Sequence, residues 1–234
     1  MTDGLTLYFH DTPGPIKALL ALEEMGLDYR LVEVDLYRGA HLEPWYKAIN
    51  PNGKVPALTD GDVTIFDSAA ILLYLAEKSG QFLPVDPVAR GRALSWLMFA
   101  SSGLGPFSGQ AVHFLRFIEE KIPYAINRYA RETERHYAVM ERRLSEGDWF
   151  AGADYSVADM AAWGWVKLAD MALESGGLSG YPKVKAWFDR VGARPAVRRT
   201  LQIGAAVRAR LKSDLDAEAR RHMFPQNRGT PAGG

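Results

Sequence analysis

The chain contains 234 residues, in which 28 lysines and arginines balance 28 aspartates and glutamates, and it has no cysteine. The balanced charge argues against a protein that binds polyanions non-specifically, because no overall field attracts phosphate. The lack of cysteine excludes disulfides, cysteine-ligated metals and a cysteine nucleophile. Any thiol chemistry must therefore use a sulfur atom that a ligand supplies.

The sequence shows no targeting or membrane segment. Its first residues have neither the basic region nor the small-residue cleavage site that marks a signal peptide. The longest uninterrupted apolar run, at 69–76, has eight residues, whereas a membrane-spanning helix needs roughly 20. We therefore expect a cytoplasmic protein that does not bind membranes.

The first eighty residues alternate between strand-forming and helix-forming segments. Strands are expected at Leu5–Phe9, Tyr29–Val34, Val55–Thr59 and Val63–Phe66, and helices at Ile16–Met25, His41–Ile49 and Ser68–Lys78. The strand–helix–strand start predicts two parallel strands joined by a crossover helix. The dipeptide Asp60-Gly61 predicts a hairpin between the last two strands.

Strand signals end at the segment Phe82–Pro87, whose two prolines indicate a connection between domains. Helices are expected beyond it at Val88–Phe99, Pro123–Leu144, Val157–Leu168 and Lys183–Val191, with a break or bend at Ser101–Gln110. The last ten residues cannot bury apolar area and are expected to be disordered. The prediction is an α/β domain over residues 1–81, a linker at 82–87, an all-α domain over 88–212, and a partly disordered polar tail at 213–234.

The segment 50–56, Asn-Pro-Asn-Gly-Lys-Val-Pro, lies between a predicted helix and a predicted strand. One interpretation is a plain turn, with Pro56 at the start of an edge strand. The other is a cis-proline whose preceding residue, Val55, offers its backbone to an extended peptide. The local pattern is compatible with both.

Asp67 directly precedes a predicted helix, and Ser68 is the first residue of that helix. The simplest interpretation is an N-cap. The same physics suits a ligand, because a helix N-terminus and a serine hydroxyl bind a carboxylate while the aspartate holds an ammonium group. An α-amino acid head with both charges would fit this pair.

Thr12 lies in the turn between the first strand and the first helix. A threonine there is usually a local cap. A hydroxyl beside the positive end of a helix also stabilises a thiolate and lowers its pKa.

No other constellation of catalytic or metal-binding residues is found in the sequence. The serines that lie near glycine lack the pattern of a nucleophile elbow. The five histidines show no spacing typical of metal ligands, so no metal cofactor is expected.

Taken together, these motifs resemble the glutathione transferases over about residues 5–200. The resemblance is carried by the segments 50–57, 65–75, 155–159, 181–184 and 194–196. The segments 96–114 and 122–129 resemble the nu class, the bacterial relatives of the yeast Ure2-like proteins. The resemblance implies a thioredoxin-like α/β N-terminal domain, an all-α C-terminal domain, and a glutathione site between them.

The resemblance also implies roles for individual residues. Thr12 matches the threonine that hydrogen-bonds the glutathione sulfur, and Gly14 stands where the class usually has asparagine. Arg128 matches an arginine that reaches glutathione in the opposite subunit, which implies a homodimer.

Five further positions match residues that hold the rest of glutathione. His41 and Lys54 correspond to residues near the glycyl end, and Asp67 and Ser68 to the pair that binds the γ-glutamyl head. The Val55 backbone would pair with the cysteinyl portion, next to a cis bond to Pro56.

The function that the resemblance implies is a glutathione-dependent thiol–disulfide oxidoreductase, with glutathione as co-substrate and no metal. Within enzymes, the alternatives are conjugation of glutathione to electrophiles, as in detoxification, and glutathione-dependent ether cleavage. A different class of alternative is a non-catalytic, glutathione-binding regulatory protein on the same scaffold. Small molecules are the expected partners, with no nucleic acid.

Overall fold

The computed structural model describes residues 4–174, 176–212 and 214–225. Its α/β part holds a four-stranded sheet in the order β2-β1-β3-β4. The strands are β1 (Leu5–Phe9), β2 (Tyr29–Glu33), β3 (Ala57–Asp60) and β4 (Val63–Phe66). β1 is parallel to β2 and antiparallel to β3, which forms a hairpin with β4. The predicted crossover and hairpin are thereby confirmed.

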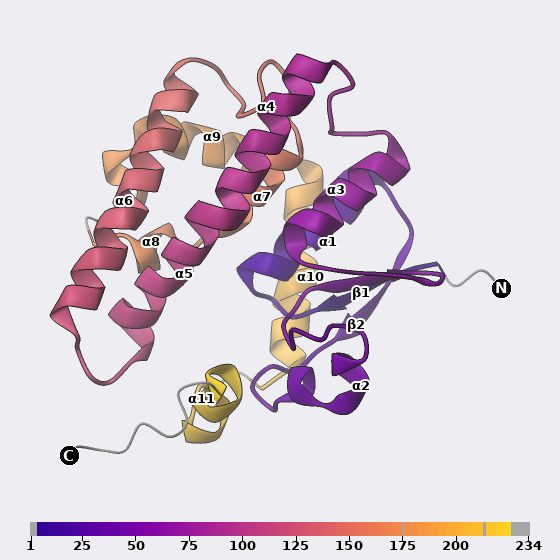
Figure 1. Cartoon of the computed structure of the whole chain (residues 1–234), viewed down its shortest axis with the longest axis vertical. Helices are drawn as coiled ribbons and strands as arrows, with labels where there is room; N and C mark the ends of the chain where they lie inside the picture. Colours follow the sequence, from indigo (N-terminus) through magenta and orange to yellow (C-terminus); the bar gives the residue numbers. More distant parts are fainter. Residues whose placement is uncertain (1–3, 175, 213, 226–234) are drawn as a thin grey trace.

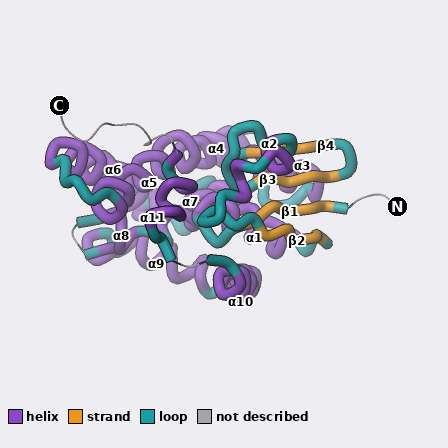
Figure 2. Tube along the Cα trace, turned by 90° about the horizontal axis from the view of Figure 1, so that it is seen from below, coloured by secondary structure: helices purple, strands orange, loops and turns teal. Residues whose placement is uncertain are grey.

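Helices cover both faces of the sheet. α1 (Pro13–Met25) and α3 (Ser68–Ser79) lie on one face, and the short α2 (Pro44–Lys47), preceded by a 3-10 turn at Ala40–Leu42, lies on the other (Figure 1). The predicted helix at His41–Ile49 therefore divides into two short pieces, because Pro44 restarts the helix at its own first position. Figure 2 shows the strands side by side at one end of the molecule.

The rest of the described chain is helical. Its α-helices are α4 (Pro87–Met98), α5 (Gly105–Val112), α6 (Pro123–Ser145), α7 (Val157–Val166), α8 (Ala169–Ala172), α9 (Pro182–Gly192), α10 (Pro195–Arg210) and α11 (Ala217–Met223). None of the described helices is long and apolar enough to cross a membrane. A small α/β domain followed by a helical domain is what the sequence predicts.

The sequence predicts a break or a bend at Ser101–Gln110, and of these the break is wrong, because the chain stays helical there. A π-helical turn at Phe99–Leu104 leads straight into α5. The glycines serve packing instead: a Cβ at Gly103 would lie 2.6 Å from Nε2 of His136, and one at Gly105 would lie 2.6 Å from the Trp165 ring. These glycines let large rings approach the helix backbone.

α11 forms in the segment for which the sequence predicts a polar tail. Asp216 caps it by accepting a hydrogen bond from the Ala219 N–H at 2.8 Å. The helix lies between α2 and the lower end of α5 (Figure 1). Just beyond it, the Phe224 ring packs against the His113 ring at 4.7 Å. Of the ten residues predicted to be disordered, all but Pro225 lie outside the described residues.

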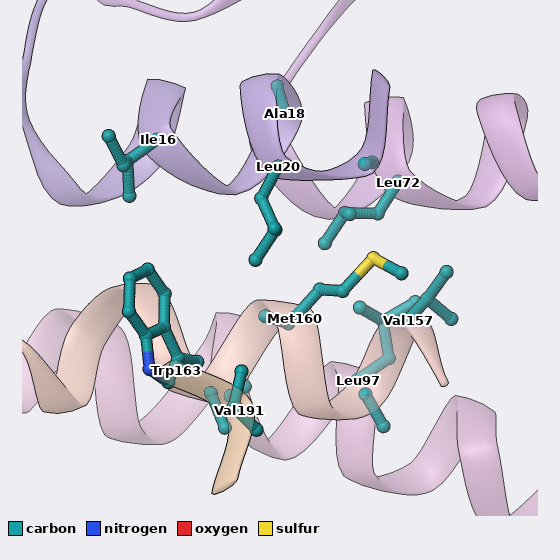
Figure 3. Packing of buried hydrophobic residues seen from close by; sticks show 14 of the residues in the cluster. Ile16, Ala18, Leu20, Leu72, Leu97, Val157, Met160, Trp163 and Val191 are labelled. Carbon is teal, nitrogen blue, oxygen red and sulfur yellow. The ribbon is translucent and has the colours of Figure 1, made fainter. Parts of the chain in front are cut away.

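The main hydrophobic core runs through both domains without a boundary. Ile16 and Leu20 of α1 point toward Met160 and Trp163 of α7 (Figure 3). α1 also packs against α10, so one helix carries most of the domain contact. Because the first turn of α1 also lies at the candidate site, that site is fixed relative to the helical domain.

Candidate glutathione site

Thr12 stands at the N-cap of α1 with its hydroxyl uncommitted to the helix. Its backbone is extended (φ −132°, ψ 164°), and its side chain makes no capping hydrogen bond. Its N–H donates to the carbonyl of His10 at 2.7 Å. The hydroxyl and the positive end of α1 are therefore available to an anion such as a thiolate.

Gly14 lets the first turn of α1 lie directly on the loop before β3. A Cβ at this position would lie 3.2 Å from Cδ of Pro56 and 3.4 Å from the carbonyl oxygen of Val55. The peptide bond between Val55 and Pro56 is cis. The structure thus brings Thr12 and Val55 to the same edge of the sheet, and an asparagine at position 14 would force this contact to open slightly.

The loop before β3 is held by two buried polar groups. The Tyr46 hydroxyl and the Asn50 side-chain amide both donate to the carbonyl of Lys54, at 2.7 and 2.5 Å. The Lys54 side chain is left exposed, and half-buried Val55 follows it, ahead of the first ladder pair between Tyr8 and Ala57. Val55 is therefore placed outside the sheet pairing, where its backbone can meet an extended ligand.

Asp67 caps α3 in an unusual backbone conformation, and Ser68 is the first residue of the helix. Asp67 has φ 73°, which non-glycine residues seldom adopt, and such residues gather at functional sites. Its Oδ1 accepts hydrogen bonds from the N–H groups of Ala69 and Ala70, at 2.8 and 3.4 Å. Both interpretations from the sequence are compatible with this geometry, because capping uses one oxygen and leaves Oδ2 for a ligand.

His41 lies close to Lys54 but is almost fully buried. It is 6% exposed, and a Cβ at Gly53 would lie 3.3 Å from its carbonyl oxygen. Burial, with smaller contributions from Lys54 and His222, lowers the pKa of His41 to about 4, against a weaker opposing effect of the His222 backbone. The imidazole is therefore neutral at physiological pH, and its Nδ1 has no hydrogen-bond partner.

Arg128 does not join the other candidate residues within one chain. It is 53% exposed on α6, lies 3.6 Å from the Glu132 carboxylate, and stands over the Phe107 ring at 5.8 Å. α6 packs against α5 and α9 of the helical domain. None of the described contacts of Arg128 reaches the α/β domain.

Sequence analysis missed two side chains that the structure places beside this site. Lys17 of α1 is buried, with its ammonium 5.2 Å from the centre of the Trp165 ring. The His222 ring of α11 covers Gly39, with its Nδ1 2.6 Å from where a Cβ would lie. Lys17 leaves a signal, since it is a lone charge within an apolar helical run. His222 leaves none, because its contact joins residues far apart in the chain.

Both domains of the chain match known glutathione S-transferase models. Residues 13–78 match the model of the glutathione S-transferase N-terminal domain, and residues 123–190 match that of the C-terminal domain. The disulfide-bond oxidoreductase YfcG of Escherichia coli is 43% identical over 204 residues, which cover 84% of this chain and 94% of YfcG.

Two solved structures are also similar. A Pseudomonas fluorescens glutathione transferase family member with two glutathione bound has a TM-score of 0.81 and 34% identity, covering 85% of this chain and 92% of its own. The Phanerochaete chrysosporium glutathione transferase URE2P6, in complex with oxidized glutathione, has a TM-score of 0.82 and 34% identity. The match covers 88% of this chain and 98% of URE2P6. The chain therefore belongs to the glutathione S-transferase family, among its Ure2-like, nu-class members.

Proposed function

We propose that this protein is a glutathione-dependent disulfide oxidoreductase. The observation that carries the proposal is the uncommitted Thr12 hydroxyl at the N-terminus of α1, facing the same edge as the Val55 backbone. With no cysteine in the chain, the thiolate held there must belong to bound glutathione. The likeness to YfcG, named a disulfide-bond oxidoreductase, supports this choice over other reactions of the family.

The reaction needs two glutathione molecules. The first thiolate attacks one sulfur of the disulfide substrate, which breaks the S–S bond, forms a mixed disulfide with glutathione and releases a thiolate that takes up a proton. A second glutathione thiolate then attacks the glutathione sulfur of the mixed disulfide. The products are glutathione disulfide and two thiols, so two electrons pass from glutathione to the substrate.

The chain's own residues would hold and orient this chemistry. The Thr12 hydroxyl donates to the thiolate, and the α1 dipole favours its charge. The Val55 backbone pairs with the cysteinyl portion, Asp67 and Ser68 bind the γ-glutamyl head, and His41 and Lys54 lie at the glycyl end.

We also propose that the protein acts as a homodimer. The edge strand β4 leaves Val63 45% and Phe66 43% exposed, and Met98 at the end of α4 is 46% exposed. In the proposed dimer a second copy covers such apolar side chains, and its Arg128 reaches glutathione in the neighbouring subunit, as the resemblance implies. Reduced glutathione is abundant in the reducing cytoplasm, where we propose the protein works.

The test compares two reactions of the wild-type protein. Reduction of hydroxyethyl disulfide by glutathione is expected to show a higher kcat/KM than conjugation of glutathione to 1-chloro-2,4-dinitrobenzene. A higher kcat/KM for conjugation would indicate that the protein conjugates glutathione to electrophiles rather than reducing disulfides. Binding of S-methylglutathione without turnover of either substrate would instead indicate a regulatory protein.

A further inference from the structure

The short helix α11 follows a segment of chain that is held along one edge of the sheet. Arg210 is the last residue of α10, and its Nε donates to Oε1 of Glu33 at 2.8 Å. The Lys212 N–H donates to Oδ2 of Asp35 at 3.4 Å. Glu33 ends β2, and its parallel neighbour β1 leads at the same edge to Thr12. The chain therefore approaches α11 along the edge of the sheet that carries the candidate site.

On the side of the α/β domain, α11 packs beside the loop that contains Val55. Met223, the last residue of α11, packs against a small buried cluster, and Val55 packs against the same cluster. The members of this cluster are Val34, Leu36, Tyr46 and Ala57. The Tyr46 hydroxyl also holds the loop by donating to the Lys54 carbonyl at 2.7 Å. α11 and the loop before β3 thus share one apolar support.

His222 fits α11 onto the turn that contains His41. Gly39 precedes this turn, Ala40–Leu42, and has a φ of 80°, a conformation that favours glycine. The His222 ring lies on Gly39, with its Nδ1 2.6 Å from where a Cβ would lie. Any side chain at position 39 would displace the ring, so α11 lies this close to the turn only because residue 39 is glycine.

On the side of the helical domain, α11 contacts the π-helical turn His113–Phe117, which continues α5. Phe224 is the C-cap of α11, and its ring centre lies 4.7 Å from that of His113 and 6.0 Å from that of Phe117. Nη1 of Arg220 donates to the Phe117 carbonyl. α11 therefore joins the loop before β3 to the end of α5, in agreement with its place in Figure 1.

We propose that α11 with its two caps, the α11 strap (Asp216–Phe224), restricts the second substrate of this protein to small disulfides. This inference rests on the proposed function, in which a thiolate at Thr12 attacks the disulfide. The reacting sulfur atoms must come within about 3.5 Å of each other. A folded protein surrounds its disulfide with bulk, so it cannot come that close while the α11 strap joins the two domains at this edge of the sheet. A small disulfide needs no such room.

The test compares a small and a large disulfide, both reduced by glutathione. Hydroxyethyl disulfide is the small one, and serum albumin that carries glutathione in a mixed disulfide is the large one. In the second reaction the bound glutathione thiolate attacks the glutathione sulfur, forms glutathione disulfide and releases the albumin thiolate, which takes up a proton. The wild-type protein should show a kcat/KM for the albumin about 100-fold or more below that for hydroxyethyl disulfide.

The double variant Met223→Ser with Phe224→Ser removes an apolar contact of the α11 strap with each domain. Reduction of the albumin should follow the population of molecules in which the strap has lifted, so its kcat/KM should rise about tenfold or more. The kcat/KM for hydroxyethyl disulfide should stay within about twofold of the wild-type value. Arg220→Met removes only the hydrogen bond to Phe117 and should raise the albumin activity alone, by a smaller factor. It answers the same question should the double variant not fold.

Ala217→Ser is the matched control, because Ala217 lies on the exposed side of α11. It should leave both values of kcat/KM unchanged. A double variant whose albumin activity stays at the wild-type level would overturn the inference, and so would one that gains or loses both activities by the same factor. A wild-type protein that reduces the albumin as efficiently as hydroxyethyl disulfide would overturn it as well.

The hydroxyethyl disulfide reaction of the wild-type protein separates this inference from the proposed function. If that reaction does not occur, the proposed function fails, and the inference fails with it. If the reaction occurs and the ratio of the two kcat/KM values is the same in the wild-type protein and the double variant, only the role of the α11 strap fails.

Discussion

The guanidinium of Arg194 binds the carboxylate of Glu24 with two parallel hydrogen bonds, Nε to Oε1 at 2.5 Å and Nη2 to Oε2 at 2.8 Å. The same guanidinium lies 4.0 Å from the centre of the Tyr155 ring. Glu24 belongs to α1 and Arg194 caps α10, so this pair joins the two domains at the opposite end of α1 from Thr12. It helps to fix the helix that carries the candidate site.

Glu24→Gln is expected to lower the free energy of unfolding by about 1–3 kcal/mol, because it leaves the partly buried Arg194 without its charge partner. The Glu24 side chain is only 6% exposed. Urea unfolding measures the change. Glu77→Gln is the control, since Glu77 pairs with Arg90 on the surface and should cost less than about 1 kcal/mol. Equal losses in both variants would contradict the role of the bridge.

Thr12→Ala should lower kcat/KM for disulfide reduction roughly 10- to 150-fold, which corresponds to losing a hydrogen bond of about 1.5–3 kcal/mol to an anion. Because the Thr12 hydroxyl makes no capping bond, the thermal midpoint should hardly change. Thr12→Ser retains the hydroxyl and should retain most of the activity. A Thr12→Ala protein as fast as the wild type would remove Thr12 from the chemistry.

Ser68→Ala should weaken glutathione binding by about 1–3 kcal/mol, since the γ-glutamyl carboxylate loses a donor. Isothermal titration calorimetry with S-methylglutathione measures this without interference from the thiol. Ser79→Ala at the other end of α3 is the control, because its hydroxyl donates to the Ala76 carbonyl and accepts from the Gln81 N–H, both far along the helix from Ser68. An unchanged affinity in Ser68→Ala would leave the Asp-Ser pair as a simple helix cap.

Arg128→Ala should reduce glutathione affinity only if two subunits associate, since no described contact of Arg128 reaches the site of its own chain. Light scattering should give about twice the chain mass of 25.9 kDa, with an interface above about 1,200 Å² in total. Arg131→Ala removes an exposed arginine paired with Glu134 on the same helix and should leave binding unchanged. A mass near that of one chain at micromolar concentration would rule out the dimer.

Asp159→Asn should destabilise the helical domain by about 1–3 kcal/mol, because an amide nitrogen would face a hydrogen-bond donor. Asp159 accepts from the Trp187 indole at 2.9 Å, from the Phe150 N–H at 3.2 Å, and from Ser156. Exposed Asp154→Asn is the control. Chemical unfolding monitored by tryptophan fluorescence measures both.

The same carboxyl predicts a pH dependence. Burial raises the pKa of Asp159 to about 6, so the folded chain binds this proton more tightly than the unfolded chain does. The wild-type protein therefore gains stability from this group as the pH falls from 7 toward 4, and asparagine cannot. The deficit of Asp159→Asn should be larger at pH 4.5 than at pH 7, and a smaller deficit at pH 4.5 would contradict the assignment.

The local patterns in the sequence predict the local structure well. The hairpin at Asp60-Gly61 depends on neighbouring residues, and it is confirmed. The glycines of Ser101–Gln110 lead to a wrong prediction of a helix break. They are there because the His136 ring of α6 and the Trp165 ring of α7 pack against the helix backbone. α11 was missed for the same kind of reason, since contacts such as that of Phe224 with His113 come from distant parts of the chain.

In the candidate site, too, the sequence predicts the residues that local patterns identify and misses the contacts between distant parts of the chain. Thr12, Val55 and Asp67 are visible in the sequence because each lies at the end of a helix or strand, where backbone groups are free for a ligand. Lys17 is conspicuous in its apolar run, but nothing local identifies Trp165 as the ring beside its ammonium. Which side chains meet across a domain junction depends on the packing of whole helices.

The backbone of Asp67 separates what folding requires at this position from what binding requires. Glycine adopts the backbone angles of Asp67, φ 73° and ψ 128°, more readily than aspartate does because it has no Cβ, and asparagine caps a helix about as well as aspartate. A library randomised at position 67 and sorted only for thermal stability should therefore enrich glycine and asparagine alongside aspartate. The same library sorted for retention on immobilised glutathione should instead return the acidic residues aspartate and glutamate, because only a negative charge attracts the ammonium group of the ligand.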